Sequence, residues 1–379
     1  MNERYLSCKE KVRKRVLQEN AFDSDDKVRK LIFEVLSEEN RKSSIRLRQR
    51  VQLGKRIFDA LRRLDVLQPL MEDTAVTDIM VNGADHIYYE RNGQMLRYEE
   101  AFESQRRLED LIQQIVGSVN RSVNEASPIA DARLADGSRV HVVLPPVALN
   151  GPVLTIRRFR EKPITMRELI QWGTVTEALA QFLQKAVRDK QNMFVCGGTA
   201  SGKTTLLGVL ANCIPRQERI ITIEDAAELR LSELDNVVTL ETRDKNAEGG
   251  GQITMRDLIR ASLRMNPDRI IVGEVRGAEA LDMLQAMNTG HEGSLSTGHA
   301  NSCRDMLMRI ETMVLMGSDM PLAAIRQQIA SALDWLIFIE KRKGGQRRVT
   351  EIVRVKGMEG DRIQTETKWT WKGEEAQWM

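Results

Sequence analysis

A short segment in the second half of the chain combines the residue types and the spacing of a phosphate-binding loop. It fits the pattern G-x-x-x-x-G-K-[ST] and consists of Gly197, Gly198, Thr199, Ala200, Ser201, Gly202, Lys203 and Thr204, with Thr205 next. Glycines in such a loop let backbone N–H groups surround an anion without side-chain clash. The lysine reaches the β- and γ-phosphates, and the hydroxyl of Thr204 supplies a ligand for Mg²⁺. The segment therefore predicts binding of ATP together with Mg²⁺.

Carboxylates follow two apolar runs that have the composition of buried strands. Glu274 comes directly after the run Arg269–Gly273, and three further acids end or follow the run Ile220–Asp225. In a parallel sheet the carboxyl ends of the strands face the ligand crevice, so Glu274 could hold Mg²⁺ through water or position the attacking water. The spacing leaves open which of the three other acids polarises that water; they are Glu224, Asp225 and Glu228.

Two of the chain's histidines lie in one segment rich in Gly, Ser and Thr. His291 and His299 both belong to the stretch Thr289–His299. Histidines placed after a phosphate-binding loop can sense the γ-phosphate by donating hydrogen bonds. A metal site is the weaker interpretation, because no cysteine or third histidine completes a ligand set. His86 and His141 stand apart and are interpreted as ordinary hydrogen-bonding residues.

Arginine is the side chain that best stabilises the charge spreading over a transferring phosphoryl group. The candidates are Arg139, Arg157 and Arg158 in the middle of the chain, and Arg243 and Arg276 further on. Each of them can instead be a solvated surface charge. If Arg157 reaches the nucleotide, ATP lies between two domains, and its hydrolysis could drive their relative motion.

The elements around these residues alternate between short apolar strands and helices. A strand is expected at Asn192–Cys196 and a helix at Lys203–Cys213, on either side of the phosphate-binding loop. Another helix, Thr254–Arg264, begins with its first residue and Asp257 at capping-box spacing. Gly344-Gly345 separates two strand-like runs and indicates a hairpin. Strands alternating with helices predict an α/β domain whose mostly parallel sheet is covered on both faces.

The first part of the chain has a different pattern of apolar residues and turn signals. The stretch Ile45–Leu67 has apolar residues near helical spacing and ends before Pro69. Beyond it, strand-like runs such as Val153–Phe159 alternate with turn signals, and a helix is expected at Arg106–Val119. These changes divide the chain into a helical module (1–68), an α+β domain (69–160) and an α/β domain with the phosphate-binding loop and a C-terminal β tail (161–379).

Composition excludes several other classes of protein. Hydrophobic residues make up 41% and charged residues 29% of the chain, and no apolar run approaches the roughly 18 residues that span a bilayer. The four cysteines have no paired or metal-ligand spacing, so we expect a reduced, cytoplasmic protein. The net charge is +3, but residues 1–66 carry 18 Lys/Arg against 11 Asp/Glu. The basic module favours an acidic partner or an anionic membrane surface, or is simply a solvated helix face.

The segments around these candidates closely resemble the ATPases of bacterial type II and type IV secretion and pilus systems, and within them the CpaF type of Tad/Flp pilus assembly. The resemblance covers roughly Leu70 to Asp361. The matching segments are Asp131–Leu134, Asp136–Val140, Leu154–Phe159, the phosphate-binding loop, Thr222–Leu229, Arg256–Met265, Pro267–Gly277, Leu281–Ser296, His299–Asn301, Arg309–Met316 and Ala324–Asp334.

The resemblance implies a RecA-like P-loop ATPase domain preceded by an α+β N-terminal domain, with residues 1–68 as an accessory helical module. It implies a homohexameric ring that hydrolyses ATP and acts on an inner-membrane platform protein, so that a cytoplasmic protein is held peripherally at the membrane. The family's boxes place Glu228 as the base, Glu274 as the Walker B glutamate, and His291 and His299 as the histidine box. They also imply Arg139, Arg157 and Arg243 as arginines of the nucleotide site.

The sequence departs from the family's pattern at two points, and four other functions compete with that of a pilus motor. Gly298 stands where the CpaF type has a larger residue, and there is no four-cysteine insertion, which argues against bound zinc. A nucleic-acid motor is disfavoured, because the chain outside residues 1–66 is net acidic and aromatic residues are only 4%, so direct nucleic-acid binding is not expected. A nucleotide-binding scaffold conflicts with the intact Lys203 and Glu274, and a small-molecule kinase lacks an acceptor site. An ATPase of a conjugative or DNA-transfer type IV system stays open.

Overall fold

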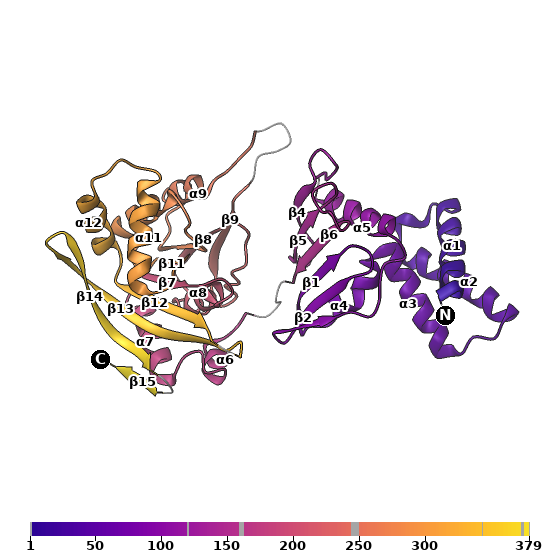
Figure 1. Cartoon of the computed structure of the whole chain (residues 1–379), viewed down its shortest axis with the longest axis horizontal. Coiled ribbons are helices and arrows are strands. Elements are labelled where there is room, and N and C mark those ends of the chain that lie inside the picture. Colours follow the sequence, from indigo (N-terminus) through magenta and orange to yellow (C-terminus); the bar gives the residue numbers. More distant parts are fainter. Residues whose placement is uncertain are drawn as a thin grey trace. The chain divides into compact units, whose positions relative to one another are not determined.

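The computed structural model describes residues 2–119, 121–158, 163–243, 250–342, 344–372 and 375–378. The chain forms two compact units, residues 1–160 and 161–379 (Figure 1). The last residue of the expected strand Val153–Phe159 lies outside the described residues. Within the first unit the helices and the sheet have separate hydrophobic clusters. The three-domain division expected from the sequence stays a prediction.

The first unit begins with helices packed around their own apolar core. They are α1 (Asn2–Gln18), α2 (Asp25–Lys42) and α3 (Leu47–Arg62), followed by a 3₁₀ turn (Asp65–Leu67) and α4 (Gln68–Glu72). Buried Tyr5, Leu31 and Ile57 bring the three helices together. The helical spacing noted over Ile45–Leu67 corresponds to α3 and the 3₁₀ turn; the helix ends at Arg62 because Arg63 is extended, and Asp65 has φ +54°.

The rest of the first unit is an antiparallel sheet with one helix on it. Within the described residues the order is β3-β2-β1-β6-β5-β4. Its strands are β1 (Val76–Asn82), β2 (Ile87–Arg91), β3 (Gln94–Arg97), β4 (Ile129–Arg133), β5 (Arg139–Val143) and β6 (Val153–Arg157), and α5 spans Gln105–Ser118. Alternate residues such as Val140 and Val142 are buried against Leu108 and Leu111 of α5, as period-two side chains require.

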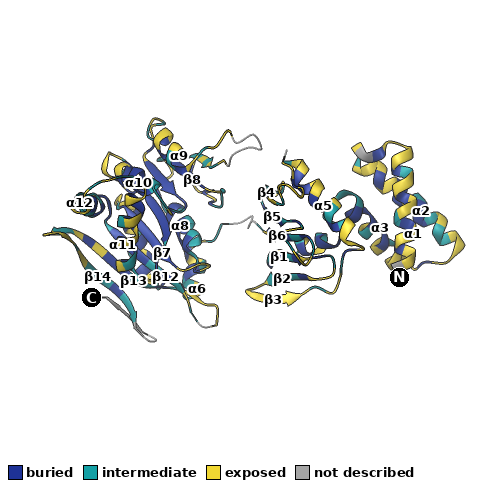
Figure 2. Ribbon diagram, turned by 45° about the horizontal axis from the view of Figure 1, so that its top comes forward, coloured by how far each residue is buried: buried dark blue, intermediate teal, exposed yellow. Residues whose placement is uncertain are grey.

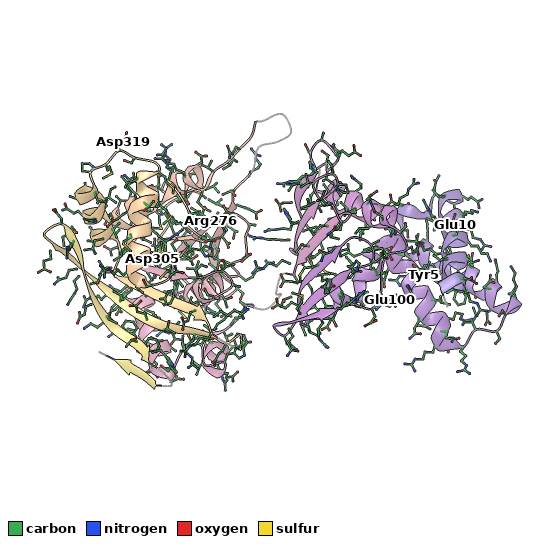
Figure 3. All side chains as sticks on the ribbon, viewed as in Figure 1. Tyr5, Glu10, Glu100, Arg276, Asp305 and Asp319 are labelled. Carbon is green, nitrogen blue, oxygen red and sulfur yellow. The ribbon has the colours of Figure 1, made fainter. Side chains whose placement is uncertain are left out.

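Polar contacts join the helices to the sheet within this unit. Arg107 of α5 donates to Asp65 at 2.5 Å and to the carbonyl of Ala60. The guanidinium of Arg56 lies over the ring of Tyr5 and donates to Glu100 at 2.8 Å; Figure 3 labels the last two residues. The helical module is therefore tied to the sheet and is not a free tail.

The second unit is built on one large mixed sheet, whose described strands lie in the order β15-β14-β13-β12-β7-β11-β10-β8-β9. The strands from β12 to β9 are parallel, and β13 to β15 add an antiparallel edge. The parallel strands are β7 (Met193–Gly197), β8 (Arg219–Glu224), β9 (Asn236–Glu241), β10 (Arg269–Val272), β11 (Leu295–His299) and β12 (Trp335–Lys341). The edge strands are β13 (Arg347–Glu359), β14 (Arg362–Lys372) and β15 (Glu375–Trp378).

Helices cover both faces of this sheet, as the sequence predicts. One face carries α6 (Met166–Gln171), α7 (Glu177–Arg188) and α8 (Lys203–Ala211). The other carries α9 (Met255–Ser262), α10 (Glu279–Asn288), α11 (Cys303–Leu315) and α12 (Leu322–Ala332). Met193 and Val195 point into the first layer, while Phe194 and Cys196 point into the second. Figure 2 shows the central strands as the most continuously buried part of the unit.

Two local expectations about turns are confirmed. Thr254 and Asp257 form the expected capping box at the start of α9. Gly344 and Gly345, both with positive φ, lie between β12 and β13, which pair as the expected hairpin. Because β7, β8, β10 and β11 run in parallel register, their carboxyl ends meet at one edge of the sheet. That edge carries the candidate site.

Candidate active site at the carboxyl edge of the parallel sheet

The predicted phosphate-binding loop joins the end of β7 to the start of α8. Ala200 (φ +57°) and Gly202 (φ +98°) adopt left-handed conformations that turn the chain into the helix. A Cβ on Gly197 would lie 2.1 Å from the carbonyl oxygen of Ile339 and 2.7 Å from Oγ of Ser201, so only glycine fits between β12 and the loop. The backbone N–H groups at the start of α8 then face the space beyond the strand, where a helix N-terminus favours an anion.

Lys203, the first residue of α8, is buried at the centre of this loop. Its Nζ donates to the carbonyl of Gly198 at 2.9 Å and lies 3.2 Å from Nδ1 of His299. Burial lowers the pKa of Lys203, and the nearby carboxylate of Glu274 opposes that shift. Oγ of Ser201 is also buried and meets no hydrogen-bond partner among the described residues. A buried cation and an unsatisfied hydroxyl beside open backbone amides fit a phosphate group.

A chain of polar contacts runs from Lys203 across the ends of three strands. Nε2 of His299 lies 2.8 Å from Oε1 of Glu274, and the other carboxylate oxygen accepts a hydrogen bond from Arg276 at 2.6 Å. Arg276, labelled in Figure 3, also contacts Asp225 at 3.1 Å. The structure therefore brings together His299, Glu274 and Asp225, which the sequence places on three different elements.

These contacts determine the protonation of His299. A lysine ammonium can only donate, so Nδ1 of His299 is the acceptor and the ring proton resides on Nε2, toward Glu274. Burial lowers the pKa of His299, and the charge of Lys203 lowers it further, against the opposing charge of Glu274. The ring is therefore neutral at pH 7 and connects a cation to a carboxylate.

The three acids at the end of β8 have different surroundings. Glu224 is 3% exposed, and its carboxylate accepts from the backbone N–H groups of Glu228 and Leu229 at 3.0 and 3.2 Å. It approaches the end of β10 because Gly273 has no side chain: a Cβ there would lie 2.7 Å from Cγ of Glu224. Glu224 thus shapes the following loop, whereas Glu228 is half-buried on that loop and Asp225 pairs with Arg276.

His291 lies at the other edge of the sheet. It precedes β11, and its Nδ1 donates to the carbonyl of Pro267, just before β10 begins. His299 ends the same strand, so the two histidines are separated by the length of β11, roughly 13 Å for four residue steps. Within one chain the structure does not bring His291 to the phosphate-binding loop.

The arginines expected at the nucleotide fall in three places. Arg243 is exposed beyond β9, where its Nε donates to the carbonyl of Gly251 at 2.6 Å. In the first unit, Arg139 and Arg157 lie directly opposite each other on β5 and β6, and Arg133 lies opposite Arg139 on β4. Arg158 instead donates to the carbonyls of Asp73 and Val76 and holds β6 in place.

One residue at the loop was not expected from the sequence. Arg347, the first residue of β13, donates from Nε to the carbonyl of Ala200 at 3.1 Å, and its Cδ lies 3.0 Å from where a Cβ on Gly202 would stand. No motif marks this arginine, and it lies far along the chain from the loop. Only the pairing of β12 with β7 could have indicated it, because that pairing brings the β12–β13 hairpin beside the loop.

Comparison with known protein families assigns the part of the chain that contains this site to one family. The family model described as type II/IV secretion system protein matches residues 61–365. The chain belongs to this family. The match includes every candidate residue named above from Arg133 to Arg347, and it leaves the first 60 residues outside. The CpaF type is not distinguished by this match and stays an expectation.

Relatives of this secretion-system protein carry names from DNA transfer. A Mycobacterium tuberculosis protein with a conjugal-transfer designation is 36% identical over 310 residues, which cover 80% of this chain and 87% of the relative. The conjugal transfer protein TrbB of Rhizobium radiobacter is 32% identical over 324 residues, covering 84% and 95%.

A solved structure supports the fold of this secretion-system protein. The pilus retraction motor PilT, crystallised with bound ADP, covers 76% of this chain and 81% of its own, with a TM-score of 0.57 and 21% identity. The fold is thus that of the RecA-like secretion ATPases, as expected. No helix in the part of the chain that the structure describes is long and apolar enough to span a bilayer.

Proposed function

We propose that this secretion-system protein is an ATP-hydrolysing motor, with the Tad/Flp pilus type as the expected system. The observation that carries the proposal is the contact chain from Lys203 through His299 to Glu274 and Arg276. It connects the lysine of the phosphate-binding loop, after β7, to a carboxylate just beyond β10, two strands away in the sheet. A carboxylate in this place can orient the water that attacks the γ-phosphate, which nucleotide binding alone does not require.

Each residue of the candidate site has a separate role in the proposed binding and hydrolysis of ATP. The loop amides and Lys203 would bind the β- and γ-phosphates, and Thr204 and Glu274 would hold Mg²⁺, the latter through water. When bound, Mg²⁺ neutralises charge on the phosphate oxygens. Oε1 of Glu274 is buried and meets no hydrogen-bond donor at a favourable angle among the described residues, so it can orient a water. Glu228 acts as the base that polarises it, on the loop that Glu224 shapes.

His299 and Arg276 set the position of Glu274. Arg276 donates to one carboxylate oxygen at 2.6 Å and fixes that side of the group. Nε2 of His299 lies 2.8 Å from the other oxygen without a hydrogen bond of favourable geometry, which leaves that oxygen able to accept from a water. A phosphate that engages Lys203 changes the partner of His299 Nδ1 and thereby reports on the γ-phosphate. His291 would act through β11 or through a neighbouring subunit, because it lies at the opposite edge.

The remaining arginines complete the proposal. Arg139 and Arg157 of the first unit, and Arg243 beyond β9, would meet the nucleotide once the domains close or once subunits assemble. The protein would then form a homohexamer in which hydrolysis moves the two domains of each subunit. At the inner face of the membrane, this motion would act on a platform protein and move pilin or substrate.

The test is phosphate release by the full chain with Mg²⁺-ATP, measured over a series of protein concentrations together with oligomer mass. Lys203→Ala and Glu274→Gln should each lower the rate by at least about a hundredfold, the scale of losing one transition-state contact. Glu233→Gln is the matched control, because that carboxylate is exposed and pairs with Arg216 on the surface.

The expected result is a rate per subunit that rises as hexamers form, and that both site variants abolish while the control keeps it. A rate that survives Glu274→Gln would refute the role of this carboxylate. ATP binding without hydrolysis at every concentration, in the presence of anionic vesicles as well, would favour a nucleotide-binding scaffold.

A second candidate is the ATPase of a conjugative or other type IV secretion system. The conjugal-transfer names of both relatives favour it. The two candidates share the same hydrolysis and differ in the membrane partner. Cross-linking the protein in its own cells would distinguish them, because a pilus platform protein supports the first and a DNA-transfer channel component supports the second.

A further inference from the structure

The corner between α2 and α3 carries an unbroken stretch of positive charge. Residues 40–58 contain seven Lys/Arg and no Asp or Glu. The corner includes the last turn of α2, the connection, and the first turns of α3. All of it precedes residue 61, where the family match begins, so the shared ATPase fold does not account for it.

Most of these cations lack an acidic partner. Lys55 and Arg56 pair with Glu72 and Glu100 at 2.6 and 2.8 Å. The other five make no ion pair within the ranges that the structure describes. These five are Arg41, Lys42, Arg46, Arg48 and Arg50, and all but Arg50, which is half-buried, are exposed.

The three acids in the second half of α2, the half nearer the corner, pair with α1. Glu38 pairs with Arg15 of α1 at 2.8 Å, and Glu39 pairs with Lys11 of α1 at the same distance. Glu34 lies 3.9 Å from Arg15. The negative charge of these three residues therefore stabilises the contact of α2 with α1, and the corner keeps its positive charge.

Apolar side chains are exposed among these cations. Leu47, Val51 and Phe33 are 67%, 64% and 63% exposed, and the guanidinium of Arg50 lies 5.8 Å from the ring of Phe33. Leu47, Val51, Gly54 and Phe58 follow helical spacing along α3. Phe58 is buried, and the guanidinium of Arg29 of α2 lies 3.9 Å from the centre of its ring. This row of small and apolar residues is therefore covered at the Phe58 end and exposed at the corner.

We propose that one surface at the α2–α3 corner binds directly to an anionic lipid surface. It is made by Arg41, Lys42 and Arg46–Val51 of the corner and by Phe33 of α2, which lies beside Arg50. Exposed apolar side chains beside Arg and Lys fit such a surface, because apolar groups enter the headgroup boundary while the cations meet the phosphates. The long arginine stems allow both at once. Five cations without acidic partners give the charge complementarity. The proposal does not depend on ATP hydrolysis.

The test is co-sedimentation of the nucleotide-free full chain with vesicles of one part phosphatidylglycerol to two parts phosphatidylcholine, and with pure phosphatidylcholine vesicles. Each cation near an anionic surface contributes roughly a fivefold factor in partitioning, so Arg46→Gln/Arg48→Gln/Arg50→Gln should weaken binding on the order of a hundredfold. Arg13→Gln/Arg97→Gln/Arg106→Gln is the matched control, since it removes the same charge from exposed arginines outside the corner.

The apolar contribution is tested with Leu47→Ser/Val51→Ser. Both side chains are exposed, so this variant should fold normally and bind the anionic vesicles more weakly, with wild-type binding falling as salt rises. Equal binding to both vesicle types, or equal losses in the corner and control triples, would overturn the proposal. The proposal would also be overturned if the wild type bound neither vesicle and the double substitution Leu47→Ser/Val51→Ser disrupted the association of subunits. The corner would then be an interface between copies of this chain.

Discussion

Two adjacent glycines of the phosphate-binding loop should differ strongly in how the same substitution affects the stability of the protein. A Cβ on Gly197 would lie 2.1 Å from the backbone oxygen of Ile339, whereas a Cβ on Gly198 meets no atom within 4 Å. The oxygen belongs to β12, whose residue Ile339 is paired with Val349, so it cannot move as a flexible side chain would. Gly197→Ala must therefore push the loop and the strand apart by at least roughly 1.3 Å to reach ordinary contact.

The cost can be estimated from overpacking in other proteins. Such insertions destabilise by about 1–3 kcal/mol. For a domain of this size each kcal/mol lowers Tm by roughly 2–4 °C, so Gly197→Ala should lower the unfolding temperature of the second unit by about 6 °C. Gly198→Ala should leave it within about 1 °C, because surface substitutions away from special features have small effects.

The assay is thermal unfolding of the nucleotide-free protein, followed by calorimetry so that the transitions of the two units can be separated. Nucleotide must be absent, since a ligand that binds the folded state alone would raise Tm and obscure the difference. Equal shifts for the two variants would refute the packing of β12 against the end of β7 on which the site is built.

Three further predictions concern the surroundings of the loop. Because the pKa of His299 is lowered, ATPase activity should stay level through pH 6.5 and fall only at lower pH, where the protonated ring can no longer accept from Lys203; phosphate release at each pH measures this. Arg347→Ala removes a hydrogen bond to Ala200 worth about 1 kcal/mol, so fluorescent ADP should bind roughly fivefold more weakly. Arg269→Met removes the buried guanidinium that pairs with Glu218 and leaves that carboxylate without its partner. The free energy of unfolding, measured with urea, should fall by about 3 kcal/mol.

Each of these predictions has its own control or opposing outcome. An activity loss centred above pH 6.5 would contradict the neutral form of His299, and His299→Gln should remove the low-pH inflection. Arg342→Ala is the control for the hairpin, because that residue contacts Glu340 at 3.3 Å and not the loop. For Arg269, unchanged stability of Arg269→Met would show that the pair with Glu218 contributes nothing net to folding.

Sequence patterns predicted the second unit well, because its strands are short, apolar and separated by strong signals. The loop, the capping box at Thr254 and the hairpin at Gly344 each follow from chemistry within a few residues. The contact of His299 with Lys203 could not be predicted in this way, because it depends on β11 being the neighbour of β7. Local sequence patterns do not determine the order of strands in a sheet.

The sequence could not assign roles within the acidic group or along the histidine segment. Glu224 and Asp225 are adjacent in the chain, yet one is buried and bonded to backbone amides while the other faces solvent and Arg276. Successive side chains of a strand point to opposite sides, and β8 keeps its extended conformation up to Glu224, its last residue. Glu224 therefore points inward and Asp225 outward. His291 and His299 look alike in sequence, but a whole strand separates them, so proximity along the chain says little about proximity at the site.

The amino edge of the sheet explains why the carboxyl edge can be open to solvent. There, the side chain of Asn192 donates to the carbonyl of Ala332 at 2.7 Å and accepts from the backbone of Ser294 at 3.0 Å, which ties the starts of β7 and β11 to the end of α12. Arg269 joins Glu218 to the carbonyl of Val187 in the same layer. These buried, fully bonded groups fix the strands at one end. The exposed ends can then hold partly unsatisfied groups, which a phosphate would complete, without loosening the sheet.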